Sequence, residues 1–128
     1  MRIALLGSIL FITAACSQID PFSDEEKTEI DCLASITVVS IMEAVRTGTE
    51  NGLTAEDLNA IPDNKIAEAI SRLEVKYPGR MDTAFLEYDI NHRLDKIQDA
   101  LANRTPTPES LTLMNETLEL GKACEFGS

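Results

Sequence analysis

The residues of this chain that are best suited to covalent chemistry are its three cysteines, Cys16, Cys32 and Cys124. A thiol can be acylated, pair in a disulfide or bind a metal ion. A metal site needs further histidine or cysteine ligands at short spacing, and the sequence places none beside these cysteines. We therefore predict no metal and no cofactor, and we take acylation and disulfide formation as the reactions open to the three thiols.

Residues 1–15 have the pattern of a secretory signal. Arg2 provides a positive start, an apolar run follows it, and residues 13–15 are small residues directly before Cys16. The apolar run is too short to span a bilayer, which takes roughly 20 apolar residues. We therefore expect residues 1–15 to be a signal peptide that is removed on export.

The motif Ala14-Ala15-Cys16 resembles the lipobox of bacterial lipoproteins, in which small residues precede a cysteine that becomes acylated. Thr13 stands where that family usually has leucine. The resemblance implies a lipoprotein with a fatty acyl chain such as palmitate on Cys16. Ser17 after the cysteine implies an outer-membrane location facing the periplasm. The alternative is cleavage before Gln18, which would leave a soluble periplasmic or secreted protein.

Loss or acylation of Cys16 leaves Cys32 and Cys124 as an even pair. Exported proteins fold in an oxidising compartment, where an even pair of cysteines favours a disulfide. We therefore expect a disulfide between Cys32 and Cys124. Two free, buried thiols are the alternative.

The single histidine, His92, stands three residues from both Asp89 and Asp95. A general base needs a nucleophile or a substrate pocket beside it, and the sequence offers neither. The acidic pair Asp95 and Asp99 lacks the inward Glu-x-x-His motifs that build metal sites in helical bundles. We therefore predict no catalytic residues and expect that the protein is not an enzyme.

Phe85 and Tyr88 share the predicted outward face of their helix with His92. Aromatic residues are scarce in this chain, with four phenylalanines, two tyrosines and no tryptophan. Exposed aromatic side chains often anchor contacts between proteins. We therefore predict that Phe85, Tyr88 and His92 contact a partner. The alternative is that another helix or the segment 47–61 covers the two aromatic rings.

These residues must be positioned by helices, because apolar residues recur at three- and four-residue spacing along the mature chain. We expect a tether over 16–22 and one helical domain over 23–128. The predicted helices run from a capping box at Ser23 and Glu26 to about Arg46, from Pro62 to Tyr77 after a short turn at 55–60, from a cap at Asp82 to Asn103, and from Thr107 and Pro108 to about Phe126. Gly48 is expected to end the first helix.

Four amphipathic helices with short connections predict an all-α fold, a small antiparallel four-helix bundle. In an up-down-up-down bundle the start of the first helix lies near the end of the last one. Cys32 and Cys124 occupy those two places, so the disulfide would join the first helix to the last. The expected disulfide and the expected helix order therefore support each other.

The net charge of −11 argues against nucleic acid and against anionic membrane surfaces as direct partners. Contact with the membrane is therefore expected through the lipid anchor alone. In size, helix number and disulfide the domain resembles the pilotins, small helical lipoproteins that escort an outer-membrane secretin. The resemblance implies an accessory lipoprotein that binds another envelope protein. The alternative is a soluble secreted protein acting as an inhibitor, a chaperone or a small-molecule carrier.

Overall fold

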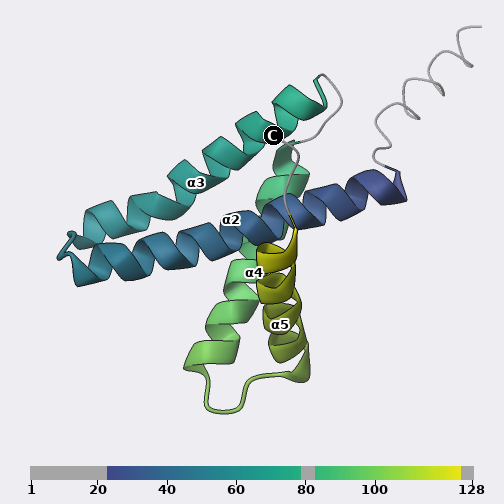
Figure 1. Cartoon of the computed structure of the whole chain (residues 1–128). Helices are drawn as coiled ribbons and strands as arrows, with labels where there is room; N and C mark the ends of the chain where they lie inside the picture. The colour runs from purple at the N-terminus through teal and green to yellow at the C-terminus, as the bar shows by residue number, and fades with distance from the viewer. Residues whose placement is uncertain (1–22, 79–82, 125–128) are drawn as a thin grey trace, which may run out of the picture.

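The computed structural model describes residues 23–78 and 83–124, and these residues form an all-α fold (Figure 1). Its described helices are α2 (Asp24–Glu50), α3 (Ala55–Lys76), α4 (Thr83–Ala102) and α5 (Pro108–Ala123). The predicted signal peptide, Cys16 and the tether over 16–22 lie outside the described residues. So do the predicted cap Asp82 and the predicted helix end at Phe126. The fold class expected from the sequence is confirmed.

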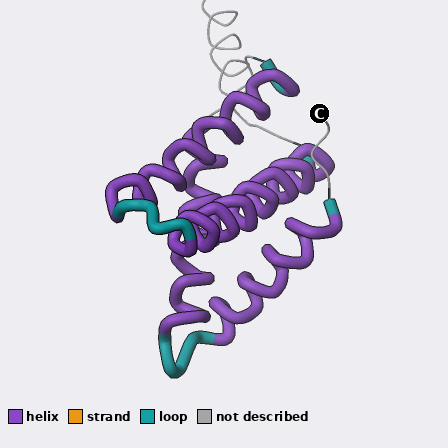
Figure 2. Tube along the Cα trace, turned by 60° about the vertical axis from the view of Figure 1, so that its left-hand side comes forward, coloured by secondary structure: helices purple, strands orange, loops and turns teal. Residues whose placement is uncertain are grey.

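Helix α2 lies at the centre of the molecule, because it contacts each of the other three helices while α3 and α5 do not touch each other. α2 and α3 form one hairpin, and α4 and α5 form a second. In Figures 1 and 2 the α4–α5 hairpin crosses the α2–α3 hairpin steeply, and its loop end extends well away from α2. The small helical bundle is therefore built from two crossed hairpins.

The predicted disulfide is present between Cys32 on α2 and Cys124, the residue that caps the end of α5. The two Cα atoms are 6.1 Å apart, and 92 positions separate the cysteines in the sequence. Closing a loop of this length removes conformational freedom from the unfolded chain, which stabilises the fold by about 4 kcal/mol. The disulfide thus joins the first and last helices of the bundle.

The hydrophobic core fills the space where the two hairpins cross. Its buried apolar side chains are Ile30, Leu33, Ala34, Val38 and Ile41 of α2, Ile66, Ala69 and Leu73 of α3, and Leu86, Ile90 and Ile97 of α4. Helical spacing puts Leu86, Ile90, Leu94, Ile97 and Leu101 on one face of α4 and so predicts that Leu101 is buried, but this residue is 66% exposed. That part of the prediction is wrong, because the far end of α4 extends beyond the cover that α2 provides.

The end of α2 differs from the prediction, because the helix continues past Arg46 and Gly48 to Glu50. Gly52, with φ +77°, is the residue that reverses the chain. The Leu53 amide donates to the Gly48 carbonyl at 2.9 Å, a bond typical of a helix closed by a glycine. A Cβ on Gly48 would lie 2.7 Å from the Leu53 side chain, so Gly48 is needed for close packing and does not end the helix.

The start of α3 also differs from the prediction. The helix begins at Ala55 and continues through Pro62, with no separate turn before it. The Thr54 hydroxyl accepts the Asp57 amide at 3.1 Å and caps the helix start. Proline removes one intrahelical hydrogen bond, and an internal proline costs about 3 kcal/mol. Leu58 and Ile61, in the turn that lacks this hydrogen bond, are half-buried. Their packing offsets the cost and holds the first turns of α3 in line.

Candidate binding surface

Two of the three residues predicted to contact a partner are exposed side by side on the outward face of α4. Phe85 is 51% exposed and Tyr88 is 68% exposed. The His92 ring stacks on the Tyr88 ring, with the ring centres 5.8 Å apart and the planes inclined by 7°. The structure therefore brings Phe85, Tyr88 and His92 together off the core. No other described helix covers the two aromatic rings.

A groove beside His92 separates α4 from α5. It has a volume of about 360 Å³ and is lined by His92 on α4 and by Pro108, Glu109, Thr112, Leu113 and Glu116 on α5. Leu113 is half-buried, whereas Glu109 and Glu116 are exposed. We refer to Phe85, Tyr88, His92 and this groove together as the α4–α5 face. It combines aromatic rings with carboxylates.

Arg93 lies beneath the α4–α5 face and is only 5% exposed. Its guanidinium donates to Thr117 Oγ1 at 2.8 Å on α5 and to Asp89 Oδ1 at 3.3 Å on α4. A second carboxylate, that of Asp31 on α2, has its Oδ1 3.5 Å from Arg93 Nη2. One buried cation therefore links three helices, and a buried cation needs such partners to offset its lost hydration.

Asp31 is the less favourably placed of these carboxylates. Burial raises the pKa of Asp31 above its ordinary value, and the charges on Asp89 and Glu116 raise it further. The Arg93 guanidinium opposes that rise in pKa but does not cancel it. The junction of α2, α4 and α5 thus places two carboxylates on a single guanidinium, with Glu116 near enough to raise the pKa of Asp31 further, and carries an excess of negative charge.

Asp99, near the end of α4, joins this helix to the start of α5. Its carboxylate accepts the Ser110 hydroxyl at 2.6 Å and the Asn103 side-chain amide at 3.0 Å. The hydrogen bond from Ser110 and then the one from Asn103 lower the pKa of Asp99 below its ordinary value. The Thr107 hydroxyl in turn accepts the Ser110 amide and caps α5. These bonds set the distance between α4 and the start of α5.

Asp89 stands three residues before His92, so helical spacing could place the two side chains beside each other. The structure instead commits Asp89 to Arg93. The Arg93 junction was missed, although one signal was present: Arg93 falls on the side of α4 that carries Ile90 and Ile97. Polar Ser110 and Thr117 are likewise buried, where apolar residues of α5 were expected.

A second hollow lies in the corner between the C-terminal halves of α2 and α4. It has a volume of about 480 Å³ and is lined mainly by apolar side chains: Ile41, Met42, Val45, Leu94, Ile97 and Leu101, with Arg46, Gln98 and Ala102 at its rim. It forms where the two hairpins diverge. It offers apolar surface but no group that could do acid–base chemistry.

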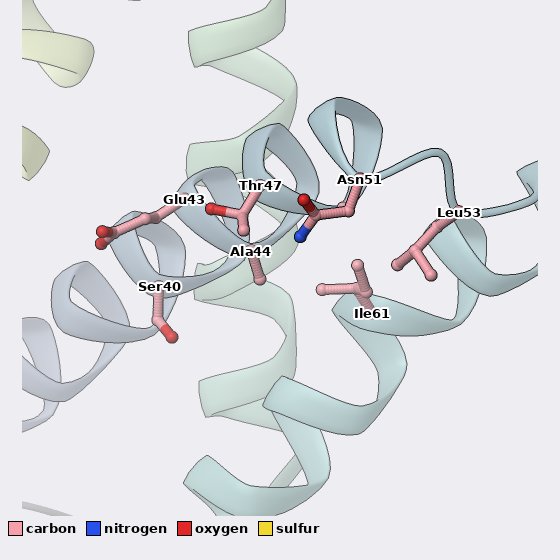
Figure 3. A pocket seen from close by; sticks show the side chains of 8 residues that line it. Ser40, Glu43, Ala44, Thr47, Asn51, Leu53 and Ile61 are labelled. Atoms are coloured by element: carbon pink, nitrogen blue, oxygen red, sulfur yellow. The ribbon is translucent and has the colours of Figure 1, made fainter.

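A third hollow, of about 500 Å³, opens between α2 and α3 near their connection. Figure 3 shows Ala44 of α2 facing Ile61 of α3, with Leu53 beside them. Glu43 is the only charged lining residue, and its carboxylate points away from Ile61. Ser40, Thr47 and Asn51 also line the hollow with hydroxyl and amide groups, but no histidine or cysteine is among its lining residues.

Within residues 23–78 and 83–124, no group of three histidine, cysteine, aspartate or glutamate side chains is placed to hold a metal ion. In the same part of the chain, no helix has the length and apolar character needed to cross a bilayer. Comparison of the chain with protein-family models, with curated proteins and with solved structures gives no match.

Proposed function

We propose that this protein is a small envelope lipoprotein that is anchored through Cys16 and binds another protein in the periplasm or at the outer membrane. The exposure of Phe85 and Tyr88 beside His92 is the observation that supports binding. An aromatic side chain buries a large area with little loss of side-chain freedom, so exposed aromatics commonly become anchors of an interface. The signal-like residues 1–15 and the lipobox-like motif support anchoring.

An accessory role of the kind that pilotins have suits these features. A helical domain closed by the Cys32–Cys124 disulfide would keep its shape in the envelope without a cofactor. A predicted tether of only residues 16–22 would hold that domain close to the membrane that carries its lipid. The protein would then present the α4–α5 face to a larger envelope protein.

The experiment that tests binding compares Phe85→Ala/Tyr88→Ala with the unchanged protein. Both proteins carry an affinity tag and are purified from detergent-solubilised membranes of the producing cells. We expect the double substitution to weaken binding by about 2 kcal/mol or more, because truncation of an aromatic anchor typically has that effect. Partners recovered with the unchanged protein should be depleted in the variant, as quantified by mass spectrometry.

Val75→Ala is the control for an exposed apolar residue on another helix, because Val75 on α3 is 84% exposed and is not part of the α4–α5 face. This control should recover the same partners as the unchanged protein. Thermal unfolding of all three proteins separates binding from folding. If Phe85→Ala/Tyr88→Ala lowers the melting temperature and leaves the recovered partners unchanged, the rings serve the core and the proposal fails.

A further inference from the structure

The composition of the α4–α5 face also indicates which kind of partner it fits. We infer that the face binds a basic segment of the partner protein, with an arginine or lysine side chain entering the groove between His92 and Glu116. This inference rests on the proposed function, because it names the chemistry of the partner that the same face would hold.

The groove between α4 and α5 carries negative charge. Glu109 and Glu116 line it from α5. Glu109 lies 3.7 Å from Lys96 in an exposed and therefore weak ion pair. Glu116 has no ion-pair partner within residues 23–78 and 83–124. The groove therefore offers at least one carboxylate that a cation from outside could pair with.

The neighbouring Arg93 guanidinium is already engaged by other partners and does not neutralise the Glu116 carboxylate. Arg93 is buried, and its three nitrogens already face Thr117, Asp89 and Asp31. Glu116 is close enough to the junction to act on Asp31, whose pKa it helps to raise. The carboxylates at this junction outnumber its one guanidinium, so a second cation at the groove would meet a net attraction.

The stacked rings of Tyr88 and His92 lie beside the groove. The face of a tyrosine ring attracts a cation, and a guanidinium also stacks flat on aromatic rings while its edge binds a carboxylate. Tyr88 supplies such a ring, and Glu116 supplies the carboxylate on the opposite wall. Phe85 adds an apolar contact for a residue next to the basic one. An acidic or phosphate-bearing partner would instead be repelled by Glu109 and Glu116.

The hollow in the corner between α2 and α4 does not compete for this segment. Its lining is mainly apolar, and its one basic residue, Arg46, already pairs with Glu50 at 3.1 Å. A basic side chain would find no free carboxylate among the residues that line it. The α4–α5 face is therefore the place on the described surface where aromatic rings and unpaired negative charge coincide.

The test uses a short fluorescent peptide of alternating arginine and leucine as the probe. Its counterpart carries citrulline in place of arginine, which keeps the shape and removes the charge. Fluorescence anisotropy with the full chain should show that the arginine peptide binds and that the citrulline peptide binds about fivefold more weakly or not at all. Equal binding of the two peptides would overturn the inference.

Charge-matched variants locate the site. Glu109→Gln/Glu116→Gln should weaken the arginine peptide about fivefold, because both substitutions remove negative charge at the groove. Glu43→Gln/Glu74→Gln removes the same charge from exposed positions on α2 and α3 and should leave the affinity nearly unchanged. Equal weakening by the two variants would mean that only the net charge matters, and the inference would be wrong.

The same variants separate this inference from the proposed function. Partner recovery from membranes is measured for each of these variants and for Phe85→Ala/Tyr88→Ala. Loss of partners with the aromatic variant but full recovery with Glu109→Gln/Glu116→Gln would keep the binding function and reject a basic partner segment. Full recovery with both variants would reject the binding function as well. Loss with both variants, at unchanged melting temperature, supports both.

Discussion

Asp31 and Arg93 show how a single buried cation can organise a helical junction. Arg93 pairs with Asp89, Asp31 and the Thr117 hydroxyl, and so contacts three helices. Its two carboxylate partners are not equivalent: Asp89 is the closer one, whereas the pKa of Asp31 is raised by burial and by neighbouring carboxylates. In the folded protein the ionised form of Asp31 is therefore disfavoured relative to the unfolded chain.

Asp31→Asn should accordingly raise the melting temperature at pH 7. A group whose folded pKa is raised binds its proton more tightly in the native state, so its ionisation at neutral pH lowers the stability of the fold. As the pH falls through the raised pKa, Asp31 becomes neutral and the advantage of asparagine should disappear. Thermal unfolding followed by circular dichroism between pH 7 and pH 3 measures this trend.

Asp89→Asn provides the opposite control. It removes the closest carboxylate of a buried guanidinium, and a hydrogen bond to a charged group contributes about 2 kcal/mol. It should therefore lower the melting temperature at pH 7. A variant Asp31→Asn that is as destabilised as Asp89→Asn at pH 7 would show that Asp31 is a net stabilising partner of Arg93, contrary to the prediction.

At the scale of the helices, the close approach of α5 to α2 depends on Gly121. A Cβ at this position would lie 2.5 Å from Val39 Cγ2 and 3.1 Å from the backbone carbonyl oxygen of Ser35. Both distances are shorter than a packed core allows, so α5 would have to move away from α2. Glycine thus sets the spacing of these helices just before the disulfide at Cys124.

Gly121→Ala should therefore destabilise the protein by about 1–3 kcal/mol, the usual cost of overpacking. Alanine favours a helix over glycine by about 1 kcal/mol, which offsets only part of that cost. Urea denaturation of Gly121→Ala, Val39→Ala and the double variant measures the coupling between the positions. We expect Val39→Ala to relieve part of the cost of Gly121→Ala, and strictly additive effects would contradict the steric explanation.

At the scale of the whole molecule, the sequence predicted the features that depend on residues close together in the chain. The predicted caps Ser23 and Thr107 each begin a helix, because an N-cap hydrogen bond spans only three residues. The outward placement of Phe85 and Tyr88 also followed from helical spacing alone. The disulfide was predictable because an even pair of cysteines remains once Cys16 is assigned to the predicted signal.

Features that depend on packing between helices were not predictable in this way. Gly48 was expected to end a helix and Pro62 to begin one, yet α2 continues through Gly48 and α3 continues through Pro62. Leu101 is exposed because the hairpins cross, which no local pattern indicates. The Arg93 junction requires three helices to meet at one point. Its partners Thr117 and Asp31 lie 24 and 62 positions from Arg93 in the sequence, and only folding brings them together.

The anchoring of the whole molecule can be tested on the exported protein. Expressed in a bacterium with an outer membrane, the full chain should lose residues 1–15, carry acyl chains on Cys16 and retain the Cys32–Cys124 disulfide. Intact-mass spectrometry before and after reduction measures all three changes together. The protein should also partition into the detergent phase, because each buried CH₂ group of an acyl chain contributes about 0.8 kcal/mol to membrane binding.

Cys16→Ser is the control for this measurement, because it removes the thiol that would be acylated and leaves the folded domain intact. The variant should lack acyl chains and leave the detergent phase, while its disulfide and melting temperature stay unchanged. A mature protein that begins at Gln18 and carries no fatty acid would reject the lipid anchor. The α4–α5 face would then belong to a soluble exported protein, and its binding would have to be tested in the periplasmic fraction.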